Sequence, residues 1–176
     1  MKRHELEHVI RASAGITGAD EFVIVGSQAI LAQYPRAPGE LTMSVEADVF
    51  TFRSAEDADL IDGSIGEGSP FHQTFGYYAH GISERAVVLP AGWRERLVRV
   101  RNENTNGATG LCLEVHDLAI SKLAAGRKKD IDFIRALLKH RLADVETMRA
   151  RLAMTNVEPR LRTACERRLK DLSIVA

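Results

Sequence analysis

The sequence predicts an α+β fold in which a mixed sheet with flanking helices is followed by a C-terminal helical region. Short apolar runs that favour strands recur as far as residue 115. Segments with helical spacing and Gly, Ser or Pro at their ends separate these runs. From His116 onward every apolar pattern has helical spacing. We therefore expect residues 1–115 to form an α/β core and residues 116–176 a helical region, together one compact domain.

The first elements are a helix and a strand. Residues 5–14 carry apolar residues at helical spacing and are followed by glycines, which predicts an opening helix. Residues 22–25 are an apolar, β-prone run that ends at Gly26-Ser27, and the chain from Gln28 suits a helix. The predicted order is strand, tight turn, helix.

The middle of the chain alternates strands with short helices. Residues 46–52 alternate polar and apolar side chains as a strand does. Ser54 and Asp57 resemble a capping box, and Ser69-Pro70 resembles an N-cap with a first-turn proline. Four further strands are predicted at residues 77–82, 86–89, 97–101 and 111–115. The last two are expected to pair as antiparallel neighbours.

Length and composition are those of a globular protein. The chain has 176 residues, of which 45% are apolar and 27% charged, enough for one domain to bury a core. No apolar run approaches the length of about 18 residues that spans a membrane, so we expect a cytoplasmic protein with no membrane partner. Cys112 and Cys165 are far apart and lack metal-binding spacing, which indicates two reduced cysteines.

The net charge of zero hides an asymmetry. Residues 1–90 carry 6 basic and 13 acidic side chains, whereas residues 91–176 carry 18 and 11. An acidic half that binds metal and a basic half that holds a phosphorylated partner would explain this distribution, and so would helices with a solvated basic face.

Two carboxylates are the first candidate for chemistry. Glu46 and Asp48 stand two residues apart on a predicted strand, so their side chains project from one face. Such a pair can hold Mg²⁺, which prefers oxygen ligands. A solvated strand face would give the same pattern. Gly26 and Ser27 at a strand-to-helix turn favour phosphate binding at exposed amides, or the glycine simply permits the bend.

Taken together these features resemble a known superfamily. Residues 25–31 (Val-Gly-Ser-Gln-Ala-Ile-Leu) and residues 44–49 (Ser-Val-Glu-Ala-Asp-Val) resemble the glycine-serine and D-x-D motifs of the polymerase-beta-like nucleotidyltransferases. Further segments resemble a small bacterial group of uncharacterised predicted nucleotidyltransferases that is similar to the AbiE-type toxins of toxin-antitoxin systems. They are residues 75–79, 89–93 and 116–130.

The resemblance implies a nucleotidyltransferase-like core and a role for each matching residue. Gly26 and Ser27 would contact a nucleoside triphosphate, and Glu46 and Asp48 would hold Mg²⁺. Asp48 would thereby act in catalysis. Glu46 stands where most relatives have Asp, and its distance in sequence from Ser27 is long.

The helical region would complete the cleft. The resemblance implies that Lys122 meets the phosphates and that Asp130 is a later catalytic acidic group, a candidate base. Arg127 would help to bind the substrate, and the basic run that it begins would attract RNA. Because Gly126 falls between Lys122 and Asp130, we predict two helices with a bend at residues 125–128, with both side chains at the cleft of Asp48.

The implied function is a Mg²⁺-dependent enzyme that moves a nucleotidyl group from a nucleoside triphosphate to an acceptor hydroxyl. tRNA is the candidate acceptor and an antitoxin protein the candidate partner, as for the toxins that the chain resembles. Two alternatives stay open: a nucleotide- or partner-binding module that has lost catalysis, and an aminoglycoside-type enzyme that modifies small molecules.

The sequence contains three weaker signals. His72 and His80 are candidates for substrate contact, although a lone histidine is more often structural. Four arginines alternate along a strand-like segment and are expected to share a face. They are Arg94, Arg96, Arg99 and Arg101. Trp93 beside them is either a stacking surface or, as we favour, a core anchor.

Overall fold

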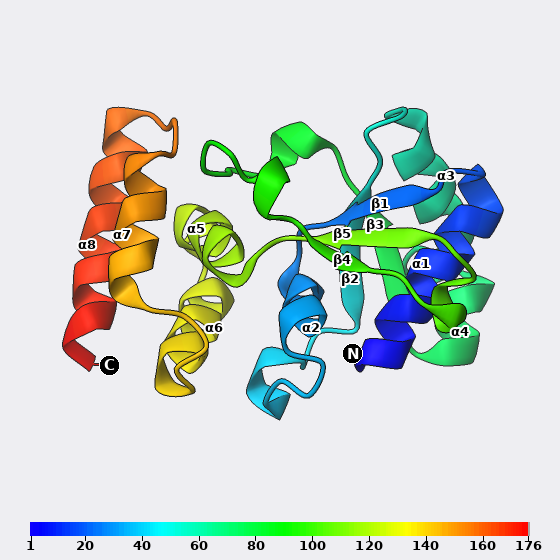
Figure 1. Cartoon of the computed structure of the whole chain (residues 1–176), viewed down its shortest axis with the longest axis horizontal. Helices are drawn as coiled ribbons and strands as arrows, with labels where there is room; N and C mark the ends of the chain where they lie inside the picture. The colour runs from blue at the N-terminus through cyan, green and yellow to red at the C-terminus, as the bar shows by residue number, and fades with distance from the viewer. Residues whose placement is uncertain (176) are drawn as a thin grey trace. The chain divides into compact units, whose positions relative to one another are not determined.

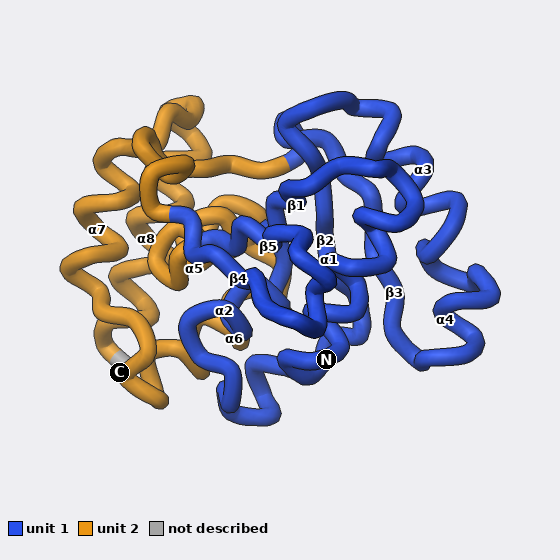
Figure 2. The backbone as a smooth tube through the Cα atoms, turned by 45° about the vertical axis from the view of Figure 1, so that its right-hand side comes forward, with its two compact units in different colours: residues 1–86, 97–113 blue, residues 87–96, 114–176 orange. Residues whose placement is uncertain are grey.

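A computed structural model describes residues 1–175, which fold as two compact units (Figure 2). Unit 1 comprises residues 1–86 and 97–113, and unit 2 comprises residues 87–96 and the chain from residue 114 onward. Unit 1 contains a five-stranded mixed sheet with flanking helices, and unit 2 contains the C-terminal helices (Figure 1). The predicted fold class is confirmed.

The sheet of unit 1 has the strand order β3-β2-β1-β5-β4. Its central strand β1 runs antiparallel to β2 and parallel to β5. β3 runs parallel to β2, and β4 runs antiparallel to β5. The strands are β1 (Glu21–Ile24), β2 (Glu46–Phe50), β3 (Tyr78–Gly81), β4 (Val98–Val100) and β5 (Thr109–Cys112). The predicted pairing of the first strand with the carboxylate-bearing strand is therefore confirmed.

Four helices belong to unit 1. They are α1 (Arg3–Thr17), α2 (Ile30–Gln33), α3 (Glu56–Ile65) and α4 (Pro70–Phe75). The apolar stripe of α1 is fully buried at Leu6, Val9 and Ile10, and α1 contacts β1, β5 and α3. The helix α3 packs against β2 and β3. Ser69 caps α4 by accepting from His72 N, with Pro70 at the first helical position, as predicted.

Unit 2 is built around one central helix. The helices are α5 (Val115–Ala125), α6 (Lys128–Lys139), α7 (Val145–Ala153) and α8 (Pro159–Val175). α5 contacts each of the other three. Gly126 ends α5 in the left-handed conformation, with φ 65°. The predicted bend between residues 125 and 128 is confirmed.

A buried ion cluster ties residues 87–96 to the helices of unit 2. Arg96 donates two hydrogen bonds to Asp117, at 2.8 and 3.1 Å, and Arg151 Nε lies 3.2 Å from the same carboxylate. Asp117 is fully buried. The cluster joins residues 87–96, α5 and α7. Removing one partner would leave buried charge uncompensated, so all three segments depend on it.

Replacing Asp117 by alanine is expected to lower the free energy of unfolding by about 3–5 kcal/mol, because two arginines lose their counter-charge. Chemical denaturation monitored by circular dichroism measures the change. The control is Asp132→Ala, which removes a half-exposed carboxylate from surface ion pairs and should cost no more than about 1 kcal/mol. Equal costs for both variants would contradict a structural role for Asp117.

The predicted strand at residues 86–89 is wrong. Glu84–Ala86 form a short 3-10 helix, and the only bridge recorded nearby in residues 1–175 joins Pro90 to Thr155. The local Val-Val-Leu composition favours a strand, but a strand also needs a partner along its length. This segment is where the chain passes from unit 1 to unit 2, so it joins no sheet.

Two local details also differ from prediction. The last strand ends at Cys112 because Glu114 is the N-cap of α5 and accepts from His116 N and Asp117 N. The Ser54/Asp57 capping box is absent, since Asp57 instead accepts hydrogen bonds from Thr51 and Arg53. The Arg53 guanidinium, four residues earlier, outcompetes the backbone for this carboxylate.

The four arginines do not share a strand face. Arg94 and Arg96 lie in a 3-10 turn of unit 2, whereas Arg99 lies on β4 of unit 1 and pairs with Glu21. Gly92, with φ 73°, begins the turn. Trp93 is half-buried with the Arg94 guanidinium over its ring at 5.4 Å, so it is not a fully enclosed core residue.

None of the helices described in residues 1–175 has both the length and the apolar character that crossing a bilayer requires.

Candidate functional site

Two neighbouring strands of unit 1 place four polar side chains together. β2 and β3 run parallel, and their register pairs Glu46 with Tyr78 and Asp48 with His80. Side chains of a strand alternate between faces, so residues two apart share a face. The register therefore places both carboxylates, the phenol and the imidazole on the same face of the sheet.

The distances show that this cluster is compact. His80 Nδ1 lies 3.2 Å from Asp48 Oδ1 and 3.3 Å from Glu46 Oε1. The hydroxyl of Tyr78 donates to Glu46 Oε2 at 3.1 Å. One ligand atom from each of Glu46, Asp48 and His80 lies within 4.8 Å of the other two. Spacings of this order suit ligands of a single metal ion.

Gly26 lies directly against this cluster. A methyl group built on Gly26 would lie 2.0 Å from Asp48 Oδ2 and 2.9 Å from its Cγ. Val25 N donates to Asp48 O at 3.1 Å, which fixes the end of β1 against β2. Only a residue without a side chain leaves room for the carboxylate at this position. The turn and the acidic pair, which the sequence predicted separately, form one site.

The helical segment that was predicted after Gly26 begins as a 3-10 turn and is short. A 3-10 turn at Ser27–Ala29 leads into the single α-helical turn of α2. Ser27, the first residue of this turn, is half-buried. Because the dipole of so short a helix is small, a phosphate here would depend on local backbone and hydroxyl groups.

The two carboxylates differ in their pKa values. Burial, the hydrogen bond with Glu46 and the charge of Glu46 raise the pKa of Asp48 to about 6. Burial also raises the pKa of Glu46, but hydrogen bonds from Asp48 and Tyr78 and the charge of His80 outweigh it and hold that pKa below its ordinary value. Like charges this close favour one shared proton in the metal-free protein. A cation bound here would relieve that repulsion.

The neighbouring groups respond to the same negative charge. Burial and the charge of Glu46 raise the pKa of the Tyr78 hydroxyl to about 12, so it stays a hydrogen-bond donor. Burial lowers the pKa of His80, but the hydrogen bond to Asp48 and both carboxylate charges outweigh it and raise the pKa. The geometry and the oxygen donors therefore fit a divalent cation, with Tyr78 orienting Glu46.

The raised pKa of Asp48 predicts a pH-dependent stability. The unfolded carboxyl titrates at about 4, so the folded protein binds more protons between about pH 4 and pH 6 and loses stability as the pH rises through that window. Without divalent cations, Asp48→Asn should be more stable than wild type at pH 8 by about 1–3 kcal/mol, and this advantage should shrink towards pH 4. Denaturation at both pH values measures it. An advantage that is independent of pH would contradict the raised pKa.

Unit 2 gathers the other predicted site residues. Lys122 Nζ lies 3.5 Å from Asp130 Oδ1, and Arg127 Nε lies 2.6 Å from Asp130 Oδ2. Lys122 also lies 4.6 Å above the ring of Phe133. Asp130 is fully buried and accepts from Arg127 N at the start of α6. The bend at Gly126 thus brings the three predicted residues into one cluster.

The electrostatics of this cluster keep Asp130 ionised. Burial raises the pKa of Asp130, but the Arg127 hydrogen bond and the charges of Lys122 and Arg127 outweigh it and lower the pKa. A carboxylate with a lowered pKa is a weak base near neutral pH. The arrangement favours Asp130 as the group that positions Lys122. That the cluster shares a cleft with Asp48 stays a prediction.

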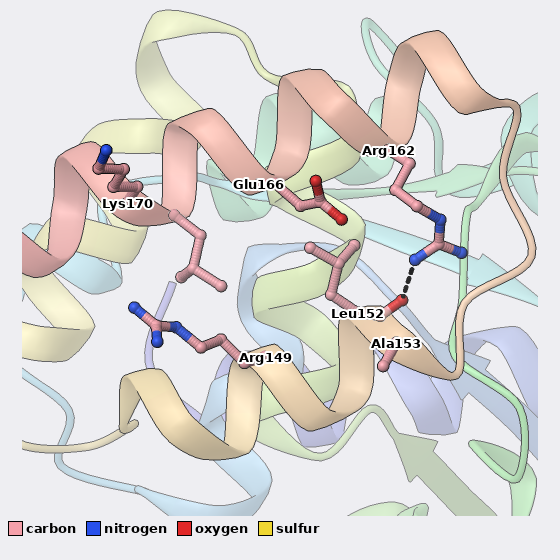
Figure 3. Close-up of a pocket in the computed structure, with 7 residues that line it drawn as sticks. Arg149, Leu152, Ala153, Arg162, Glu166 and Lys170 are labelled. Atoms are coloured by element: carbon pink, nitrogen blue, oxygen red, sulfur yellow. Dashed lines mark hydrogen bonds between the residues drawn. The ribbon is translucent and has the colours of Figure 1, made fainter.

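Unit 2 also has a cavity of about 430 Å³ between α7 and α8 (Figure 3). The buried Leu152 and Leu169 line it, and three basic side chains and Glu166 surround them. The basic residues are Arg149, Arg162 and Lys170. Arg162 donates to Leu152 O at 3.1 Å and so helps to join the two helices. None of the predicted site residues lines this cavity.

Two residues of the site have only a weak signal in the sequence. His80 has the pattern of a lone histidine, and no motif assigns a role to Tyr78. The available signal was that Tyr78 and His80 lie two residues apart on another predicted strand. They thus repeat the spacing of Glu46 and Asp48. Without the register of β2 and β3, nothing showed that the two pairs face each other. His72, the other histidine considered, accepts from Gly68 N and does not contact the carboxylates.

A comparison with protein families gives one finding. A family model described as "Nucleotidyltransferase of unknown function (DUF6036)" matches residues 4–174, nearly the whole chain. The match spans both units and includes every predicted site residue. Comparisons with curated proteins and with solved structures gave no match.

Proposed function

The chain belongs to this family of nucleotidyltransferases, and on that premise we propose that it moves a nucleotidyl group from a nucleoside triphosphate to an acceptor hydroxyl. The observation that carries the proposal is the close approach of the Asp48 carboxylate to Gly26. A methyl group at residue 26 would lie 2.0 Å from Asp48 Oδ2. This approach joins the carboxylate pair to the turn that the family resemblance assigns to the triphosphate. A solvated strand face would not require a glycine opposite the carboxylate.

The reaction is a substitution at the α-phosphorus. The acceptor oxygen forms a bond to that phosphorus, the bond to the oxygen bridging to the β-phosphate breaks, and pyrophosphate leaves with the bonding electrons. The acceptor hydroxyl loses its proton to solvent water. Positioning and charge neutralisation supply most of the catalysis in such transfers.

Glu46 and Asp48 would hold the cation, for which Mg²⁺ is the proposed identity. When bound, it would supply Lewis-acid stabilisation of the charge that develops on the phosphate oxygens. Tyr78 keeps Glu46 oriented through its hydrogen bond, and Gly26 leaves the space in which Asp48 lies. Lys122 and Arg127 are proposed to neutralise phosphate charge, with Asp130 holding both cations in place.

RNA, with tRNA as the first candidate, is the proposed acceptor. Unit 2 carries 16 basic and 10 acidic side chains, whereas unit 1 carries 8 and 14. A polyanion is attracted to the basic unit. The basic residues around the cavity between α7 and α8 add to this field.

The test uses the full chain with Mg²⁺, total RNA and each nucleoside triphosphate labelled at either the α- or the γ-phosphate. We expect label from one α-labelled nucleotide, and none from the γ-labelled form, to enter RNA of tRNA size. An aminoglycoside mixture in place of RNA tests the small-molecule alternative. No labelling of either acceptor, together with nucleotide binding, would overturn transfer in favour of a binding module.

The toxin-like role is proposed on the resemblance alone and has its own test. Expression of the wild-type chain in a bacterium should arrest growth, whereas Asp48→Ala should not. Growth of both strains at equal rates, with equal amounts of protein, would argue against a toxin while leaving the transfer assay unaffected.

A further inference from the structure

The imidazole of His80 lies close to both carboxylates of the pair, whereas a hydrogen bond would need only one. Its Nδ1 lies at nearly equal distances from Asp48 Oδ1 and Glu46 Oε1, 3.2 and 3.3 Å. In an octahedral complex with bonds of about 2.1 Å, adjacent ligand atoms lie about 3 Å apart. Both distances from the imidazole nitrogen therefore match the spacing of adjacent ligands around one ion, and one ligand atom from each of the three residues lies within 4.8 Å of the other two.

We propose that His80 is the third protein ligand of the metal ion and that its imidazole makes the site bind Mn²⁺ more tightly than Mg²⁺. The inference deepens the proposed function and rests on it for the metal-binding role of Glu46 and Asp48. It goes further in assigning a nitrogen ligand and a metal preference.

The donor set supports this preference. Mg²⁺ strongly prefers oxygen ligands, whereas Mn²⁺ accepts an imidazole nitrogen beside carboxylates and binds mixed sites more tightly. Tyr78 donates to Glu46 Oε2, which leaves Oε1, the atom near His80, for the ion. The His80 side chain is 49% exposed, so the site also has an open side for water or a phosphate oxygen.

A competing explanation gives His80 only the role of a counter-charge. A protonated imidazole between two carboxylates would then occupy the place of the cation and compete with it. The two explanations predict opposite effects of removing the ring: loss of a ligand weakens Mn²⁺ binding, whereas loss of a competitor strengthens it.

The test is Mn²⁺ and Mg²⁺ binding by the purified full chain without nucleotide, measured by calorimetry at pH 8. Wild type should bind Mn²⁺ at least about 10-fold more tightly than Mg²⁺. His80→Gln should lose at least about 10-fold in Mn²⁺ affinity and change Mg²⁺ affinity less than about 3-fold. The matched control is His4→Gln, which changes an exposed histidine on α1 of the same unit.

Electron spin echo modulation of bound Mn²⁺ detects a coordinated nitrogen directly. A purely structural role of His80 would not produce this signal. Wild type and His4→Gln should show the nitrogen modulation of a coordinated imidazole, and His80→Gln should lack it. Thermal melts of all three proteins check that they are folded. Absence of Mn²⁺ binding, absence of the nitrogen signal in wild type, or unchanged or tighter binding by His80→Gln would each overturn the inference.

These failures are distinguishable from failure of the proposed function. If nucleotidyl transfer occurs and depends on Asp48 while His80→Gln binds Mn²⁺ like wild type, only the histidine ligand is refuted. If Asp48→Ala transfers nucleotide as well as wild type does, the proposed metal site itself is refuted, whatever His80 does.

Discussion

Replacement of Asp48 by alanine is expected to lower the rate of nucleotidyl transfer by about a thousandfold or more while leaving the protein folded. The carboxylate is one of the proposed metal ligands, and loss of Lewis-acid stabilisation at the transferring phosphate costs several kcal/mol in the transition state. The fold does not need the charge, because in the metal-free protein burial and Glu46 disfavour its ionised form.

Label transfer and thermal melting measure the two sides of this prediction. The variant should melt at or above the wild-type temperature without divalent cations, since it removes a site of like-charge repulsion. Asp59→Ala is the control, because Asp59 is an exposed carboxylate on α3 of the same unit. Equal transfer by Asp48→Ala and wild type would refute metal-assisted chemistry at this site.

Replacement of Gly26 by alanine should reduce transfer by about 100-fold, because misplacing a catalytic group by about 1 Å has an effect of that size. The new methyl group would lie 2.0 Å from Asp48 Oδ2, so the carboxylate must move away. Gly26 has φ −76°, which alanine adopts without strain. The loss would therefore come from displacement of Asp48 and not from the backbone.

Steady-state kinetics and metal titration of the Gly26→Ala variant check this expectation, and metal affinity should fall together with the rate. Gly63→Ala is the matched control, since a methyl group at this α3 position meets nothing within 4 Å. It should keep full activity and gain about 0.5–1 kcal/mol of stability from the higher helix propensity of alanine. Wild-type kinetics for Gly26→Ala would show that the position of Asp48 is not critical.

Local patterns were sufficient for much of the fold. The run before Gly26 is a strand because its apolar side chains suit a buried pleated surface, and it is fully buried in the structure from Phe22 to Ile24. Cys165, Leu169 and Leu172 are buried along α8, as their spacing predicted. Both results depend on the periodicity of apolar residues within one element, and this periodicity can be read directly from the sequence.

Local patterns misled where the deciding partner was distant in sequence. Val87 and Val88 have strand propensity but begin the first segment of unit 2, where no neighbouring strand pairs along their length. Arg96 was expected on a basic strand face, but it turns to pair with Asp117, 21 residues away. The charge-assisted hydrogen bonds to a buried carboxylate decide where this arginine lies, and the alternation of side chains along the sequence does not contain that information.

The candidate site divides in the same way. The sequence by itself determined that Glu46 and Asp48 share a face, because a strand repeats every two residues, and that Gly26 stands at a turn. Only the tertiary structure decided that β3 lies beside β2 in the register that places His80 opposite Asp48. Register between strands about 30 residues apart depends on which faces the whole core buries, and no local pattern contains that information.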